Sequence, residues 1–111
     1  MGAAPAAFTL WDRFLKYNPA DSKWPDRDRF ILSKGHGCPV LYATFAEAGY
    51  IDRSLLMTLR KLGSPLQGHP DKRFLPVLEA STGSLGQGVS IGIGTALAAK
   101  LDKADYHTFV M

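Results

Sequence analysis

Apolar residues near the amino terminus recur at intervals of three and four positions, the spacing of one helix face. This pattern predicts a helix over residues 6–17, ended by Asn18-Pro19 because the residue before a proline avoids helical backbone. A second helix is predicted over residues 38–48, closed by Gly49. The apolar positions of the first helix are Phe8, Leu10, Trp11, Phe14 and Leu15.

A shorter helical segment and a long connection follow. Asp52 is placed to cap a helix over residues 53–62, which Gly63 ends. The connection over residues 63–79 contains three prolines, and a connection of this length is unusual in a compact domain unless it has a function. We therefore expect a functional loop there.

The last predicted helix covers residues 87–101. Its glycines, Gly88, Gly92 and Gly94, each weaken a helix by about 1 kcal/mol relative to alanine. Close packing against another element explains such glycines, and so does simple tolerance. The apolar positions on one side of this helix are Val89, Ile93, Ala96, Leu97 and Leu101.

Two short runs, residues 29–33 and 107–111, have the composition of β-strands. Because helices separate them along the chain, the pattern favours an α/β layer structure with a mainly parallel sheet. No turn, cap or polar tail follows the second run, so we expect residues 1–111 to be part of a domain that is cut in mid-fold.

Composition and charge narrow the class of protein. The 111 residues are 46% apolar and 21% charged, which is typical of one globular domain. The net charge of +3 is spread along the chain, so neither a nucleic-acid partner nor, without an 18-residue apolar stretch, a membrane span is expected. The single Cys38 and the lack of a secretory signal pattern favour the cytoplasm.

Candidate chemistry lies in two histidine turns, Gly35-His36-Gly37 and Gly68-His69-Pro70. Glycine lets a backbone approach a ligand closely. His36 precedes a predicted helix, where free amides favour an anion, although it is equally consistent with ordering the turn. His69 is suited to proton exchange with a hydroxyl near neutral pH, the alternative being an exposed loop histidine. His107 is predicted to be structural.

Other motif matches are weak. The glycine loop over residues 81–88 fits neither the dinucleotide fingerprint nor a Walker loop. Ser90 lies in a Gly-x-Ser-x-Gly pattern, but a hydrolase nucleophile elbow needs a preceding strand, and this context reads as helix. His36 and Cys38 without a second ligand pair are a poor zinc signal.

Three motifs in order resemble the amino-terminal, diphosphate-binding domain of transketolase: WPDRDRFILSKGHG at residues 24–37, GHPD at 68–71 and STGSLGQG at 81–88. The likeness extends over nearly the whole chain. At positions 34 and 84, where the chain has Lys34 and Ser84, its sequence resembles that of the separately encoded amino-terminal subunits of two-chain transketolases.

The resemblance implies a fold and a reaction. The fold would be part of a parallel-sheet thiamine-diphosphate-binding domain with helices on both faces. The activity would be transfer of a two-carbon ketol unit from a ketose phosphate to an aldose phosphate in the pentose phosphate pathway, with thiamine diphosphate as electron sink. His36 would contact the diphosphate, His69 would lie over the reacting centre, and the aminopyrimidine side would meet Gly83, Ser84 and Leu85.

The resemblance also implies what this chain lacks. A further histidine element would precede residue 1, and the ligands of Mg²⁺ or Ca²⁺ would follow residue 111, so no metal ligand is assigned within the chain. The activating glutamate would come from another domain across a dimer interface, within a homodimer or a heterotetramer. We therefore expect the chain, truncated at both ends, to be inactive alone. The alternatives are a deoxyxylulose-phosphate synthase-like enzyme and a non-catalytic interaction module.

Overall fold

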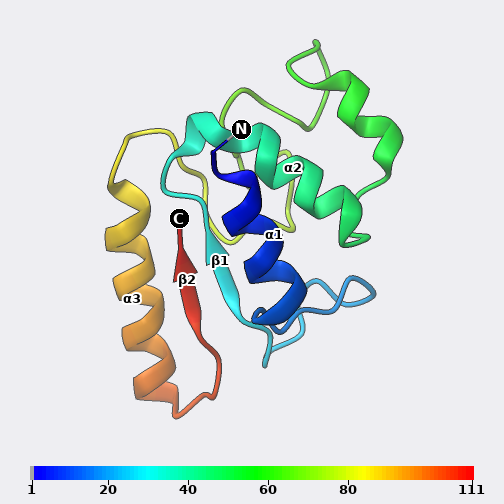
Figure 1. Cartoon of the computed structure of the whole chain (residues 1–111). Coiled ribbons are helices and arrows are strands. Elements are labelled where there is room, and N and C mark those ends of the chain that lie inside the picture. The colour runs from blue at the N-terminus through cyan, green and yellow to red at the C-terminus, as the bar shows by residue number, and fades with distance from the viewer. Residues whose placement is uncertain (1) are drawn as a thin grey trace.

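The computed structural model describes residues 2–111. Along the chain lie α1 (Ala4–Arg13), β1 (Arg29–Ile31), the 3₁₀ turn η1 (Gly35–Gly37), α2 (Cys38–Glu47), the 3₁₀ helix η2 (Arg53–Thr58), α3 (Gln87–Asp102) and β2 (Thr108–Val110) (Figure 1).

The two strands form a parallel pair, in which Phe30 lies opposite Phe109 and Ile31 opposite Val110. This confirms the parallel pairing predicted for the two strand runs. Side chains alternate between the faces of a sheet. Phe30 and Phe109 face the core that contains Trp11, whereas Val110 faces α3, which runs beside β2 in Figure 1.

The core is built around the indole of Trp11 on α1. Its ring centroid lies 5.8 Å from that of Phe30, 5.6 Å from that of Phe45 on α2 and 5.9 Å from that of Tyr50. These edge-on contacts are a favourable geometry for aromatic rings. One aromatic cluster therefore joins α1, α2 and the sheet.

The first helix is shorter than the apolar pattern predicted, because it ends at Arg13 rather than near residue 17. The amide of Leu15 turns back to the carbonyl of Leu10, which directs Leu15 into the core. Phe8 and Phe14, which were predicted on the apolar face, are instead largely exposed. The face that α1 buries is the one carrying Ala7 and Trp11, one turn apart.

The helix predicted over residues 53–62 is a 3₁₀ helix that ends at Thr58. The predicted cap is confirmed, since the Asp52 carboxylate accepts a hydrogen bond from the Ser54 amide at 2.7 Å. Arg60 then adopts left-handed backbone, with φ of 61°, and its amide donates to the Leu66 carbonyl. This reversal prevents the helix from continuing and starts the long connection.

The helix predicted over residues 87–101 is present as α3, but it packs by its glycine side. A Cβ on Gly88 would lie 2.6 Å from the Cα of Ser33, and a Cβ on Gly92 would overlap the Val110 side chain. Close packing therefore explains both glycines, whereas Gly94 has no such neighbour within 4 Å. Within residues 2–111, no helix is long and apolar enough to cross a membrane.

Candidate functional site

An open groove of about 500 Å³ lies between the second histidine turn and the glycine loop. Its lining residues are Gln67, Gly68, His69, Pro70, Asp71, Ser81, Thr82, Gly83, Ser84 and Gln87. Among the predicted site residues, the structure thus brings together His69, Gly83 and Ser84. Leu85 and His36 are exposed and are not among the groove's lining residues.

The imidazole of His69 lies against the backbone of Gly83. A Cβ at position 83 would be 3.6 Å from Cδ2 of the ring, which is ordinary van der Waals contact. The ring is solvent-exposed, so it remains accessible to a ligand in the groove. The long connection over residues 63–79 therefore does contribute a wall to the candidate site, as a functional loop would.

The carbonyls of the His69 turn are held by side chains from α2. The Tyr42 hydroxyl donates to the Gln67 carbonyl at 2.9 Å, and the Cys38 thiol donates to the Gly68 carbonyl at 3.1 Å. Burial raises the pKa of both groups above their ordinary values. Both side chains therefore keep their protons near neutral pH and remain donors.

Thr82 fixes the other wall of the groove. Its hydroxyl donates to the Leu32 carbonyl at 2.6 Å, and its amide donates to the Pro70 carbonyl at 3.1 Å. Its own carbonyl touches Gly35, where a Cβ would lie only 2.6 Å from the Thr82 oxygen. The glycine loop is thereby joined to the end of β1, to the His69 turn and to η1.

His36 lies on η1, immediately before α2. Its neighbour Gly35 packs against the glycine loop, so His36 is one residue away from a backbone contact with the groove wall. At the start of α2 the Cys38 amide donates to the Gly35 carbonyl and Pro39 has no amide hydrogen, so these two residues do not offer the free amides expected beside His36. Contact between His36 and a diphosphate stays a prediction.

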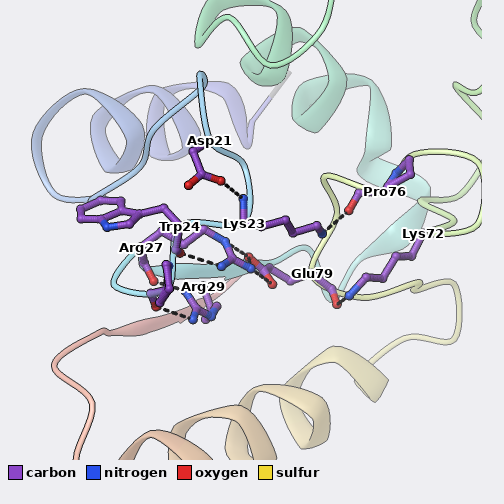
Figure 2. Close-up of polar contacts among 9 residues, drawn as sticks. Asp21, Lys23, Trp24, Arg27, Arg29, Lys72, Pro76 and Glu79 are labelled. Atoms are coloured by element: carbon purple, nitrogen blue, oxygen red, sulfur yellow. Dashed lines mark hydrogen bonds and ion pairs between the residues drawn. The ribbon is translucent and has the colours of Figure 1, made fainter.

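A polar network braces the loop that carries the groove (Figure 2). The Arg27 guanidinium donates to both Glu79 carboxylate oxygens at 2.9 Å, and the two side chains are only 12% and 18% exposed. Lys23 and Lys72 donate to the carbonyls of Pro76 and Glu79. The polar loop after α1 therefore supports the connection between the two groove walls.

Asp71 supplies the negative charge of the groove. Hydrogen bonds from Arg73 hold the pKa of the Asp71 carboxyl at about 2, so it stays ionised over the physiological range. Arg73 lies on the exposed side of this pair. The groove thus presents an imidazole, hydroxyls, two side-chain amides and one ionised carboxylate, paired with Arg73, to a polar ligand.

The structure bears on two motif matches that the sequence had made weak, the hydrolase pattern at Ser90 and the zinc pair of His36 and Cys38. Ser90 lies within α3 rather than on a turn after a strand, so the hydrolase motif is not a nucleophile elbow. Over residues 2–111, no group of three or more His, Cys, Asp or Glu side chains is arranged to hold a metal ion. His36 and Cys38 therefore belong to no such group among these residues.

Sequence analysis missed Tyr42, Cys38 and Thr82 as parts of the site. Tyr42 and Cys38 lie four residues apart within an apolar helix, so they resemble ordinary core positions. Thr82 lies inside the glycine motif at residues 81–88, and this position is the one feature of the sequence that could have indicated its part in the site.

Comparisons with known proteins find similar sequences that cover nearly the whole chain. A protein-family model described as "Transketolase, thiamine diphosphate binding domain" matches residues 1–109. A transketolase from Halalkalibacterium halodurans is 48% identical over 109 residues, covering 96% of this chain and 16% of the relative. The human transketolase-like protein 2 is 47% identical over 110 residues, covering 98% of this chain and 17% of the relative.

Solved structures match the shape as well. The crystal structure of a Pichia stipitis transketolase in complex with sedoheptulose 7-phosphate superposes with a TM-score of 0.91 at 39% identity. It is matched over 97% of this chain and 18% of that chain. A transketolase from Leishmania mexicana gives a TM-score of 0.87 at 39% identity. The chain therefore spans less than a fifth of the length of these relatives.

Proposed function

Because the chain belongs to the transketolase family, we propose that it supplies part of the thiamine diphosphate site of a ketol-transferring enzyme. The reaction would move a two-carbon unit from a ketose phosphate to an aldose phosphate. The observation that carries this proposal is the groove in which the His69 ring lies against the Gly83 backbone.

The residues present fit such a cofactor in part. The groove wall has no side chain at Gly68 and Gly83, and the backbone there packs closely against the Arg60 guanidinium and the His69 ring respectively. Hydroxyl and amide groups of Ser84 and Gln87 line the same space. Thiamine diphosphate, when bound, supplies the electron sink that allows a carbon–carbon bond next to a carbonyl to break.

Each side chain has a distinct part in this proposal. His69 forms a hydrogen bond with a hydroxyl of the sugar, and it donates a proton to that hydroxyl or accepts one from it as charge develops. Gly83, Ser84 and Leu85 meet the aminopyrimidine side, and His36 meets the diphosphate. Mg²⁺ or Ca²⁺ would be bound by residues outside this segment.

The remaining partners of the site also belong to the proposal. We infer a larger parallel sheet with helices on both faces, of which β1 and β2 are two strands. The rest of the transketolase, as further domains or a second subunit, would complete a cytoplasmic homodimer or heterotetramer. The segment alone would then be inactive.

The test is to express the chain with its natural continuation and the remaining domains, and to assay ketol transfer between sugar phosphates. His69→Ala should lower kcat/KM by about 10²-fold or more, the loss typical of a proton-transferring side chain. The matched control is His107→Ala, which removes an exposed histidine that does not line the groove. An assembly with no ketol transfer, or an unaltered His69→Ala variant, contradicts the proposal.

Product analysis separates the nearest rival. A deoxyxylulose-phosphate synthase-like enzyme would use pyruvate as its donor and release carbon dioxide, whereas the proposed enzyme would use a ketose phosphate and release an aldose phosphate. Incubation of the assembled protein with each donor identifies the class directly.

A second candidate, a non-catalytic interaction module, is favoured by the exposed apolar side of α3. Titration of the 111-residue chain with thiamine diphosphate and Mg²⁺ distinguishes the two interpretations of the isolated chain. Tight binding would contradict our expectation that half of the cofactor site lies elsewhere.

A further inference from the structure

We propose that Tyr42 is a positioning residue for His69, with Cys38 as its helper. It would hold the turn over residues 67–69 so that the imidazole faces the groove. The inference rests on the proposed function, in which His69 contacts the substrate. Neither Tyr42 nor Cys38 lines the groove, so in this proposal both act on the reaction through the turn and not by touching the substrate.

The contacts come from one face of α2. Tyr42 and Cys38 are one helical turn apart and therefore project side by side. They are 1% and 0% exposed, and their donors reach the Gln67 and Gly68 carbonyls at 2.9 Å and 3.1 Å. The Tyr42 hydroxyl also lies 3.4 Å from the carbonyl of His69 itself.

These bonds orient the turn because they attach to its inner side. With its carbonyls directed at buried donors on α2, the turn presents the exposed His69 ring to the opposite, groove side. Arg60 is the third side chain that reaches the turn, with 3.5 Å from its Nη2 to the Gly68 carbonyl. The tyrosine bond is the shortest of these contacts, so its removal should move the ring most.

The helper contact from Cys38 acts at the next carbonyl. A thiol is a weaker donor than a hydroxyl, and here it has no exposure to solvent. Burial raises the pKa of both groups, so neither loses its proton under conditions in which an enzyme would work. The orientation of the turn is then constant with pH, which suits a residue that itself exchanges protons.

The first experiment reads the ring directly in the 111-residue chain. Tyr42→Phe removes the hydroxyl and keeps the aromatic ring, and the imidazole carbon-bound proton resonances of His69 are recorded by NMR. The matched control is Tyr50→Phe, which alters a tyrosine whose ring packs against Trp11 and Phe45 in the aromatic cluster. We expect the His69 resonances to shift in Tyr42→Phe and to stay in place in Tyr50→Phe.

The second experiment is a double-mutant cycle in the assembled enzyme. Tyr42→Phe should lower kcat by about tenfold, as expected for a misplaced catalytic group. In the His69→Ala background the same substitution should cause no further loss, because the group that it positions is already absent. A general structural role would instead give the same loss in both backgrounds.

Several outcomes would overturn the inference. They are unmoved His69 resonances in Tyr42→Phe, an unchanged kcat, or an equal loss in both backgrounds. Full activity of His69→Ala would instead contradict the proposed function, while the NMR result would still decide whether Tyr42 places the ring. If Tyr42→Phe fails to fold, Cys38→Ala and Cys38→Ser provide the same comparison, since serine keeps a donor and should retain the His69 resonances better than alanine.

Discussion

Thr82 is the residue at which three parts of the site meet, and its hydroxyl is a sensitive point of the fold. Thr82→Val keeps the volume but leaves the Leu32 carbonyl without the donor now 2.6 Å away. An unsatisfied buried carbonyl costs about 1–3 kcal/mol. We expect urea unfolding of the 111-residue chain to show a loss of this size.

Thr82→Ser is the control, because it retains the hydroxyl and removes only a methyl group. It should unfold closer to the parent chain than Thr82→Val does. Equal midpoints for the parent and Thr82→Val would show that the hydrogen bond does not stabilise the groove wall.

Glycine and proline mark the His69 turn as one that can approach a ligand, whereas the roles expected for Gly83 and Ser84 came from the resemblance to transketolase. The residues that hold those turns were not predictable in the same way. Tyr42 acts on a carbonyl 25 positions away, and Thr82 acts on one 50 positions away. Such contacts exist only after the chain has folded.

Among the helices, α3 shows which properties of an element a periodic apolar pattern predicts and which it does not. Its existence and length were predicted because the helical apolar spacing continues along residues 87–101, even though three glycines there lower the helix propensity. Its orientation was not, since the buried side carries Gly88, Gly92 and Ala99 while the larger apolar side chains are exposed. A small side chain permits close approach to a sheet, and hydrophobicity alone does not report that.

Two glycines of α3 give opposite predictions for the same substitution. Gly92→Ala places a methyl group into the Val110 side chain and should destabilise the chain by about 1–3 kcal/mol, the usual cost of overpacking. Gly94→Ala meets no neighbouring atom within 4 Å and should stabilise the helix by up to about 1 kcal/mol. Thermal unfolding of both variants measures the difference.

The pair is its own control, because both variants add one methyl group to the same helix two residues apart. If Gly92→Ala were as stable as Gly94→Ala, α3 would not pack against β2 as closely as the structure places it.

On the scale of the whole molecule, the groove is assembled by segments that are distant in sequence. Arg27 and Glu79, 52 residues apart, join the loop after α1 to the connection that carries His69. The parallel pairing of β1 with β2 was predictable from the order of elements, whereas this ion pair was not, because its two loops have no periodic pattern. Because both side chains are largely buried, removing either partner would leave the other charge unpaired and would lower the stability of the fold.

The buried donors on α2 also predict how the stability of the whole chain depends on pH. Burial raises the pKa of Cys38 above 9.0 and that of Tyr42 above 10.0 in the folded chain. Their stabilising contribution is complete below those unfolded values and is lost as the pH rises towards the folded values. Each proton released only on unfolding changes the free energy of unfolding by at most about 1.4 kcal/mol per pH unit. The melting temperature should therefore fall from about pH 9 upward, and Tyr42→Phe should fall less steeply above pH 10, whereas parallel curves would show that Tyr42 titrates as freely in the folded chain as in the unfolded one.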